Sequence, residues 1–352
     1  MLANVQALRA LAALMVVYVH CELLIPSIRQ VWPFVGDVRE AFGSGVDLFF
    51  IISGFIMVYT TGLKHSGPVA FFAHRIARIV PLYWLLTLCT FVLALILPSV
   101  LAHTTASLSG FVKSLLFIPY TRGDGTMRPV LFLGWTLNYE MFFYVLFALG
   151  LFVREPVPRL VAVASLIVAM VTFGVVFREY LSAPLRFITR PIILEFIPGM
   201  ILGLIYPRLP NSQRATRLAM VALPCGFIAL ILAAHLNNSV WPLTAIPATG
   251  LMVAALVLER AGVSATGDSL QLIGAASYSL YLSHPFVTQG VSKLAASSGL
   301  LASSLASAIL IILAYGLSII AGIAIYRFIE RPLSTRARRL LESNRIKSGA
   351  RN

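Results

Sequence analysis

The feature of this sequence that most limits its fold is a series of apolar runs, each about as long as a bilayer-crossing helix. A membrane helix needs about 20 apolar residues, because only elements that close their own backbone hydrogen bonds can cross hydrocarbon. A membrane β-barrel would show alternating segments of about ten residues, and this sequence does not. The pattern predicts an all-α, polytopic integral membrane protein with about ten transmembrane helices. The expected spans are 5–25, 43–62, 79–100, 131–153, 159–177, 190–206, 217–236, 240–260, 270–290 and 303–327.

Two of these spans are weaker than the others. The span 190–206 is short and contains Glu195 and Pro198, and the span 240–260 contains two prolines and closely follows its neighbour. An error of one span would reverse the predicted side of the membrane for the far end of the chain.

Composition and charge agree with a membrane protein. Of the 352 residues, 59% are hydrophobic and 11% are charged, whereas about a quarter of a typical soluble domain is charged. A net charge of +14 would suggest nucleic-acid binding in a soluble protein, but here Lys and Arg lie between and beside the apolar runs. Their distribution follows the positive-inside rule and predicts that both termini face the cytoplasm. We therefore expect the lipid bilayer, and no nucleic acid, as a partner.

The chain divides into few parts. We expect one membrane-embedded domain at 1–335 and a basic cytoplasmic tail at 336–352, whose arginines act as a topology anchor near anionic lipid. The longest connection, about 101–130, is rich in Gly and Pro and is predicted to be a structured outer loop. The three cysteines are odd in number and lack metal-site spacing, so we expect neither a disulfide framework nor a metal.

Ionisable residues inside membrane spans are candidates for function, because burying them in lipid costs free energy. Arg9 and His20 are eleven residues apart in the first span. On a helix this spacing is about three turns, or about 16 Å, and returns to nearly the same face. The alternative for each residue alone is structural: an arginine that snorkels to the interface and a histidine buried against a carbonyl.

Two further arginines lie at the expected cytoplasmic entrance of the third span. Arg75 and Arg78 are three residues apart and would share one helix face. Guanidinium groups bind phosphate through paired donors at fixed charge, and the adjacent helix N-terminus would add partial positive charge. Two positive-inside anchors would give the same spacing.

Acidic and imidazole groups lie toward the opposite side. Asp47 begins the second span near the depth expected for His20, so it could orient the imidazole by accepting from one ring nitrogen. Glu140 is expected near mid-membrane and Glu195 near the outer end of its span.

Near the C-terminus, Ser277, Tyr281 and His284 follow at i, i+4 and i+7 and would form one polar stripe. Polar contacts between helices would explain each of them structurally. Taken together, cations gather toward the inner half of the membrane, while histidines and carboxylates gather centrally and outward. Such a path suits a phosphate-bearing donor from the cytoplasm and a hydroxyl from outside, but it equally suits a proton-coupled transporter.

At these motifs the sequence resembles the acyltransferase-3 family of bacterial membrane O-acyltransferases, most closely its exopolysaccharide O-acetylase branch. The resemblance covers nearly the whole chain. Its motifs are 6–9 with His20, 45–55, 75–84, 135–144 and 277–284.

The resemblance implies a ten-helix protein of the bacterial inner membrane that uses an acyl-coenzyme A donor, with acetyl as the expected acyl group. The acceptor would be a hydroxyl of a cell-surface or exported polysaccharide or of a lipid-linked glycan. No permanently bound cofactor is implied. The resemblance also implies that the Arg-to-His pair of the first helix and the Arg-x-x-Arg motif are needed for activity, which carries over to Arg9, His20, Arg75 and Arg78.

The mechanism predicted from these residues has three parts. Arg75 and Arg78, with Arg9, hold the donor phosphates. His20 is the general base or a transient acyl carrier, supported by Asp47 or Glu140 as further catalytic residues. The candidate substrate-binding residues are Trp135, Glu195, Tyr281 and His284. The competing hypothesis is a proton-coupled transporter or flippase for a lipid-linked sugar, with His20 and Glu140 as relay groups.

Overall fold

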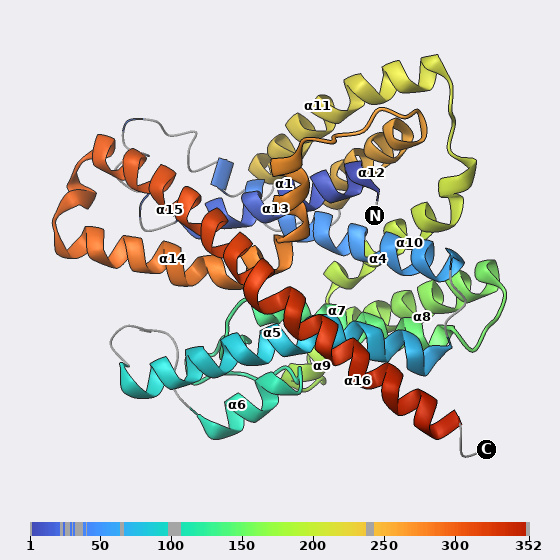
Figure 1. The fold of residues 1–352 in the computed structure, drawn as a ribbon, viewed down its shortest axis with the longest axis horizontal. Helices are drawn as coiled ribbons and strands as arrows, with labels where there is room; N and C mark the ends of the chain where they lie inside the picture. The colour runs from blue at the N-terminus through green and yellow to red at the C-terminus, as the bar shows by residue number, and fades with distance from the viewer. Residues whose placement is uncertain are drawn as a thin grey trace. The chain divides into compact units, whose positions relative to one another are not determined.

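The computed structural model describes residues 2–21, 24, 29, 31, 38–39, 41–63, 67–97, 107–236 and 243–349, and within them it contains helices and no strand (Figure 1). Contacts divide the chain into two compact units. Unit 1 comprises the described parts of Met1–Tyr59 and Glu195–Tyr326, and unit 2 those of Thr60–Leu194 and Arg327–Asn352. Parts of the expected segments 5–25, 79–100, 101–130, 240–260 and 336–352 lie outside the described residues.

Among the described residues, unit 1 contains eight helices of eight residues or more. They are α1 (Ala3–Val19), α4 (Gly45–Leu63, up to Tyr59), α10 (Phe196–Ile205), α11 (Gln213–Leu236), α12 (Ala245–Arg260), α13 (Asp268–Ala275), α14 (Ser277–Ser297) and α15 (Ser304–Ile325). The 3-10 turns η4 (Tyr206–Arg208) and η5 (Leu300–Ala302) belong to this unit, as does Glu195, the last residue of the 3-10 turn η3 (Pro191–Glu195). Figure 1 shows α14 and α15 as antiparallel neighbours, and α11 packs along α12 in the same way.

Unit 2 centres on one long helix. Its elements are α5 (Pro68–Ile96), α6 (Leu108–Leu115), α7 (Gly134–Gly150), α8 (Pro156–Val176), α9 (Ala183–Ile188), the π-turn η6 (Tyr326–Glu330) and α16 (Arg331–Gly349). α5 packs against α6, α7 and α16, and Figure 1 shows α16 crossing it.

The expectation of an all-α membrane protein is confirmed at the level of helix length and composition. Six helical segments of the described chain are long and apolar enough to cross a membrane. They are Gly45–Leu63, Pro68–Ile96, Pro156–Val176, Ala183–Arg208, Gln213–Ala233 and Ser304–Leu341. α1 is apolar but has 17 residues, as does α7, and α12 has 16. Ten crossings and cytoplasmic termini stay predictions.

Two helix boundaries differ from the expected ones. α5 begins at Pro68, not at residue 79, because Gly67 is extended and Pro68 occupies the first helical position, where its missing N–H is harmless. Arg75 and Arg78 therefore lie about two turns inside α5, so the predicted contribution of a helix N-terminus to their phosphate binding is wrong. The expected span 270–290 is broken at Ala276 into α13 and α14.

The N-terminus of α1 is fixed by polar contacts. The Glu259 carboxylate accepts from the backbone N–H groups of Ala3 (2.9 Å) and Asn4 (2.6 Å), which have no partner within the helix. The Asn4 amide nitrogen donates to Val263 O (2.8 Å), and Ala265 N donates to the Asn4 Oδ1 (2.7 Å). These bonds set the position of the helix that carries Arg9 and His20.

Glycines allow α4 and α10 to touch backbone to backbone. A Cβ on Gly54 would lie within 3.0 Å of Phe196 O, and one on Gly199 would lie as close to Ile51 O. One turn further, a Cβ on Gly203 would also meet α4 within 3.0 Å. Small residues are the usual means by which membrane helices approach closely, because packing and not hydrophobic burial drives their association.

In unit 2, the segment before α7 is held by side-chain bonds to backbone. The Arg122 guanidinium donates to Arg128 O (2.8 Å), Pro129 O and Val130 O (3.0 Å). Asp124 accepts from the Thr126 N–H and hydroxyl, and these bonds lower the pKa of Asp124 below its ordinary value. The part of the expected 101–130 loop that is described is therefore ordered, as predicted.

The glycine contact gives a testable prediction. Gly199→Ala should destabilise the protein by about 1–3 kcal/mol, because the new methyl group must push α4 and α10 apart. Gly316→Ala is the matched control: Gly316 also lies in an apolar helix, but a Cβ there meets nothing within 4 Å. Thermal unfolding of the detergent-solubilised protein measures both. Equal melting temperatures for the two variants would contradict the close contact.

Candidate active site

Unit 1 brings His20 and His284 together. His20 lies at the C-terminal end of α1 and is half-buried, and His284 is fully buried on α14. The Nε2 atom of His284 lies 3.1 Å from Nδ1 of His20, and the ring centroids are 4.9 Å apart. Two residues that the sequence singled out separately therefore form one hydrogen-bonded pair.

Each ring of this pair also meets a backbone carbonyl of its own helix. His20 Nδ1 lies 2.9 Å from Val16 O, and His284 Nδ1 lies 3.0 Å from Leu280 O. Tyr281 packs edge-on against His284 at 6.2 Å between centroids. The structural alternative for His20, a ring beside a carbonyl, is thus realised in part, together with a contact to a second titratable group.

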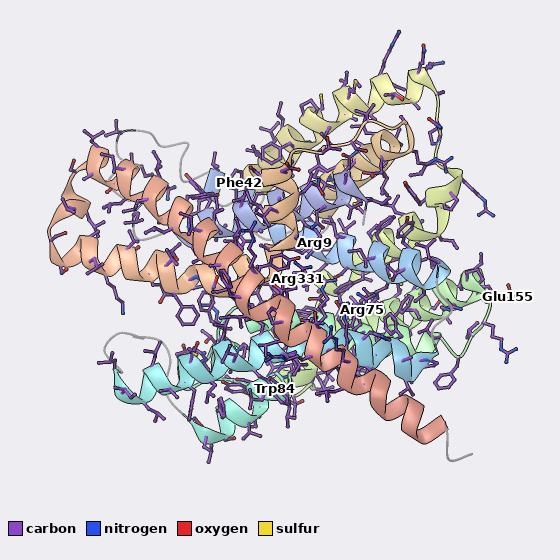
Figure 2. The ribbon with its side chains drawn as sticks, viewed as in Figure 1. Arg9, Phe42, Arg75, Trp84, Glu155 and Arg331 are labelled. Atoms are coloured by element: carbon purple, nitrogen blue, oxygen red, sulfur yellow. The ribbon has the colours of Figure 1, made fainter. Side chains whose placement is uncertain are left out.

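Arg9 occupies the other end of the same helix contact. It is buried, and its Nη2 donates to Ser277 Oγ (2.8 Å) while its Nη1 donates to Gln6 Oε1 (3.2 Å). The Arg9–His20 stripe of α1 therefore faces the Ser277–His284 stripe of α14. Figure 2 labels Arg9 among the side chains around α1. Arg9 does not snorkel to an interface; it is held within the helix bundle.

Two acids of unit 1 form a second polar cluster. Asp47, in the first turn of α4, is 8% exposed, and Glu195, at the end of η3, is fully buried. The Asp47 carboxyl interacts with the side chains of Glu195 and Thr244. Two carboxyl groups buried near one another raise the cost of ionising both. The sequence indicated each acid but not that they are partners.

Unit 2 holds the Arg-x-x-Arg motif. The Arg75 guanidinium lies over the rings of Phe71 (5.4 Å) and Tyr144 (5.9 Å), and its Nη2 donates to Thr60 Oγ1 (3.2 Å). The Tyr144 hydroxyl donates to the Glu140 carboxylate. Arg75 is thus fixed in orientation by stacking and hydrogen bonding, as a guanidinium that binds through its edge requires.

Glu140 does not neutralise all of the positive charge around Arg75. Glu140 attracts the guanidinium, whereas Arg78 and Arg338 are near enough to repel it. The Nε atom of Arg75 is buried and has no hydrogen-bond partner among the described residues. Three guanidinium groups, one carboxylate and an unused donor are the chemistry of an anion site.

The contribution of α16 was missed by the sequence analysis, which treated the tail as a topology anchor. Ser334 Oγ donates to Arg78 O (3.5 Å), and α16 packs along α5. Arg331, Ser334 and Arg338 follow at i, i+3 and i+7, so the spacing could have indicated one face directed at a neighbour. Figure 2 labels Arg75 on α5 and Arg331 on α16.

The expected substrate-binding residues fall in both units. Glu195, Tyr281 and His284 belong to unit 1. Trp135 belongs to unit 2, where it lies in the first turn of α7 with its ring edge-on to Tyr139 at 6.1 Å. Glu140, expected to support His20, belongs to unit 2 and contacts Tyr144.

The comparisons with known proteins agree with these motifs. The acyltransferase-3 model, described as an acyltransferase domain, matches residues 2–327. The exopolysaccharide production protein ExoZ of Rhizobium meliloti (strain 1021) is 37% identical over 297 residues, which cover 84% of this chain and 90% of that protein. No solved structure matches the chain. With a family match over nearly its whole length, the chain belongs to the acyltransferase-3 family and is a membrane acyltransferase.

Proposed function

We propose that this enzyme transfers an acyl group from acyl-coenzyme A to a hydroxyl of an exported or cell-surface polysaccharide at the bacterial inner membrane. Acetyl is the acyl group that we expect. The observation that carries the proposal is the anion site around Arg75, with its excess positive charge and buried unused donor. The similarity to a protein named for exopolysaccharide production supports the acceptor class.

The donor is assigned to the anion site because coenzyme A carries several phosphate charges. Arg75 would bind one phosphate through the edge of its guanidinium, and Arg78 would add charge from the same face of α5. Glu140 then acts on the donor side: it limits the repulsion among the arginines and holds Tyr144. Arg9 is hydrogen-bonded to buried partners in unit 1, so a structural role in that unit is enough to explain its presence inside the helix bundle.

His20 is assigned to the chemical step. As the acceptor oxygen attacks the acyl carbonyl carbon, His20 takes the hydroxyl proton. The new C–O bond forms, the C–S bond breaks, and the thiolate of coenzyme A takes the proton back from His20. Atoms and charge balance without a further reactant. Asp47 and Glu195, with Tyr281, are assigned to the acceptor because a buried pair of carboxyl groups can hydrogen-bond a sugar hydroxyl.

Replacing the base should remove most of the activity. His20→Ala is expected to reduce acetyl transfer by about 10²–10⁴-fold, the usual contribution of a positioned base. The measurement is the acetyl-ester content of the polysaccharide in a deletion strain that carries the variant. His74→Ala is the control, since His74 is an exposed histidine whose ring contacts the Ala70 carbonyl of its own helix. Undiminished acetylation in His20→Ala at normal protein level would refute the assignment.

The guanidinium at position 75 should not be replaceable by another cation. Arg75→Lys keeps the charge but loses the fork and the stacking on Phe71 and Tyr144, so the dissociation constant for acyl-coenzyme A should rise about tenfold, or ~1.4 kcal/mol. Calorimetry on the purified protein measures it. Arg217→Lys, at an exposed position on α11, serves as the control. Unchanged affinity in Arg75→Lys would exclude the fork as the binding group.

The structure also separates two neighbouring arginines of α16. Arg338 is near enough to repel the Arg75 guanidinium, whereas Arg339, one residue on, points about 100° away around the helix. Arg338→Glu should therefore weaken acyl-coenzyme A binding about tenfold or more, and Arg339→Glu, with the same change of net charge, should leave it within about twofold. The same loss in both variants would indicate a diffuse effect of charge at the membrane surface.

A further inference from the structure

The two backbone carbonyls beside the histidine pair determine where its protons lie. A carbonyl oxygen only accepts, so the His20 Nδ1 that faces Val16 O must carry a hydrogen. The His284 Nε2 that faces the same Nδ1 must then accept. His284 consequently carries its own hydrogen on Nδ1, which is the atom that faces Leu280 O.

A second feature of α14 supports this arrangement. The carbonyl of Tyr281 also hydrogen-bonds the His284 ring. Pro285 follows at i+4 from Tyr281 and, lacking an N–H, cannot donate to that carbonyl as an ordinary helical residue would. The backbone thus presents two acceptors to one side of His284, and its other nitrogen remains the acceptor that meets His20.

We propose that His284 is a positioning residue that, together with Val16 O, holds His20 as the Nδ1–H tautomer and so makes Nε2 of His20 the basic atom. This inference rests on the proposed role of His20 as the base. His284 then has the part that the sequence analysis gave to Asp47, and it is not an acceptor-binding residue. When His20 takes a proton on Nε2, its Nδ1–H keeps the bonds to Val16 O and to His284.

A neutral partner differs from a carboxylate in one respect that matters for this reaction. It orients the ring and accepts from it without placing a fixed negative charge beside the base. The proton that His20 takes from the hydroxyl must return to the coenzyme A thiolate. A base that held its proton through an adjacent carboxylate would return it less readily, because the ion pair stabilises the imidazolium.

The test compares variants of the purified enzyme by kcat and KM. His284→Ala should lower kcat by about 10- to 100-fold with little change in KM for either substrate, because the tautomer is no longer fixed while the binding sites remain. His284→Gln should recover most of the loss, since its amide oxygen reaches the position of Nε2 and accepts there. Thr288→Val, a nearly isosteric change at a fully buried position one turn along α14, is the control for packing.

Nuclear magnetic resonance with ¹⁵N-labelled histidine supplies a second readout. The Nδ1–H tautomer of His20 should be the single neutral form in the wild-type protein and in His284→Gln. A mixture of tautomers should appear in His284→Ala, because without His284 the ring can turn away from Val16 O. The His20 signals are identified by their loss in His20→Ala.

The outcomes separate this inference from the proposed function. Wild-type kcat in His284→Ala, or a rise in KM for the glycan alone, would overturn the positioning role while leaving His20 as the base. An unchanged His20 tautomer in His284→Ala would overturn it as well. Full activity in His20→Ala would instead overturn the proposed base itself. If His284→Ala fails to fold, His284→Gln decides: low kcat with a folded protein counts against the inference.

Discussion

A polar side chain inside an apolar helix bundle needs a partner within the bundle, and this requirement fixes the placement of α1. The Glu259 carboxylate accepts from the backbone N–H groups at the beginning of α1. Ser277 accepts from Arg9 in the first half of α1, and His284 hydrogen-bonds His20 at the end of α1. In hydrocarbon the alternative to each bond is an unsatisfied group, which costs several kcal/mol. The proposed base therefore lies on a helix that is held at three levels by partners from α12 and α14. The small apolar residues of α1 add packing contacts but do little to fix the position of the helix.

The two units differ in the charge they hold. Unit 1 brings ionisable groups of the same kind together, as the histidine pair and the two acids show. Unit 2 keeps an excess of positive charge around Arg75 and stabilises it with aromatic faces and one carboxylate. Aromatic rings attract a cation without neutralising it. Such a site retains its attraction for a polyanion, which full pairing with carboxylates would remove.

Much of the candidate site could be predicted from spacing, because helix periodicity determines which residues share a face. Arg9 with His20, Arg75 with Arg78, and Ser277 with His284 all follow from it. Periodicity does not say which neighbour a face will meet, so Asp47 was the expected partner of His20 where the structure has His284. The start of α5 was misplaced because hydropathy follows apolar content and not the extended Gly67 and the proline after it. The role of α16 was missed because a helix rich in arginine looks like solvated surface until a neighbour is known.

The contact between α4 and α10 has a consequence for the two acids at their ends. Asp47 lies near the beginning of α4 and Glu195 directly before α10, and Gly54 and Gly199 let the two helices meet without any side chain between them. The separation of the two helices at this contact is then set by the thickness of bare backbone, the one dimension of a helix that does not vary between sequences. These glycines therefore hold the two helices that carry the acids at one fixed approach, which a larger residue at either position would change.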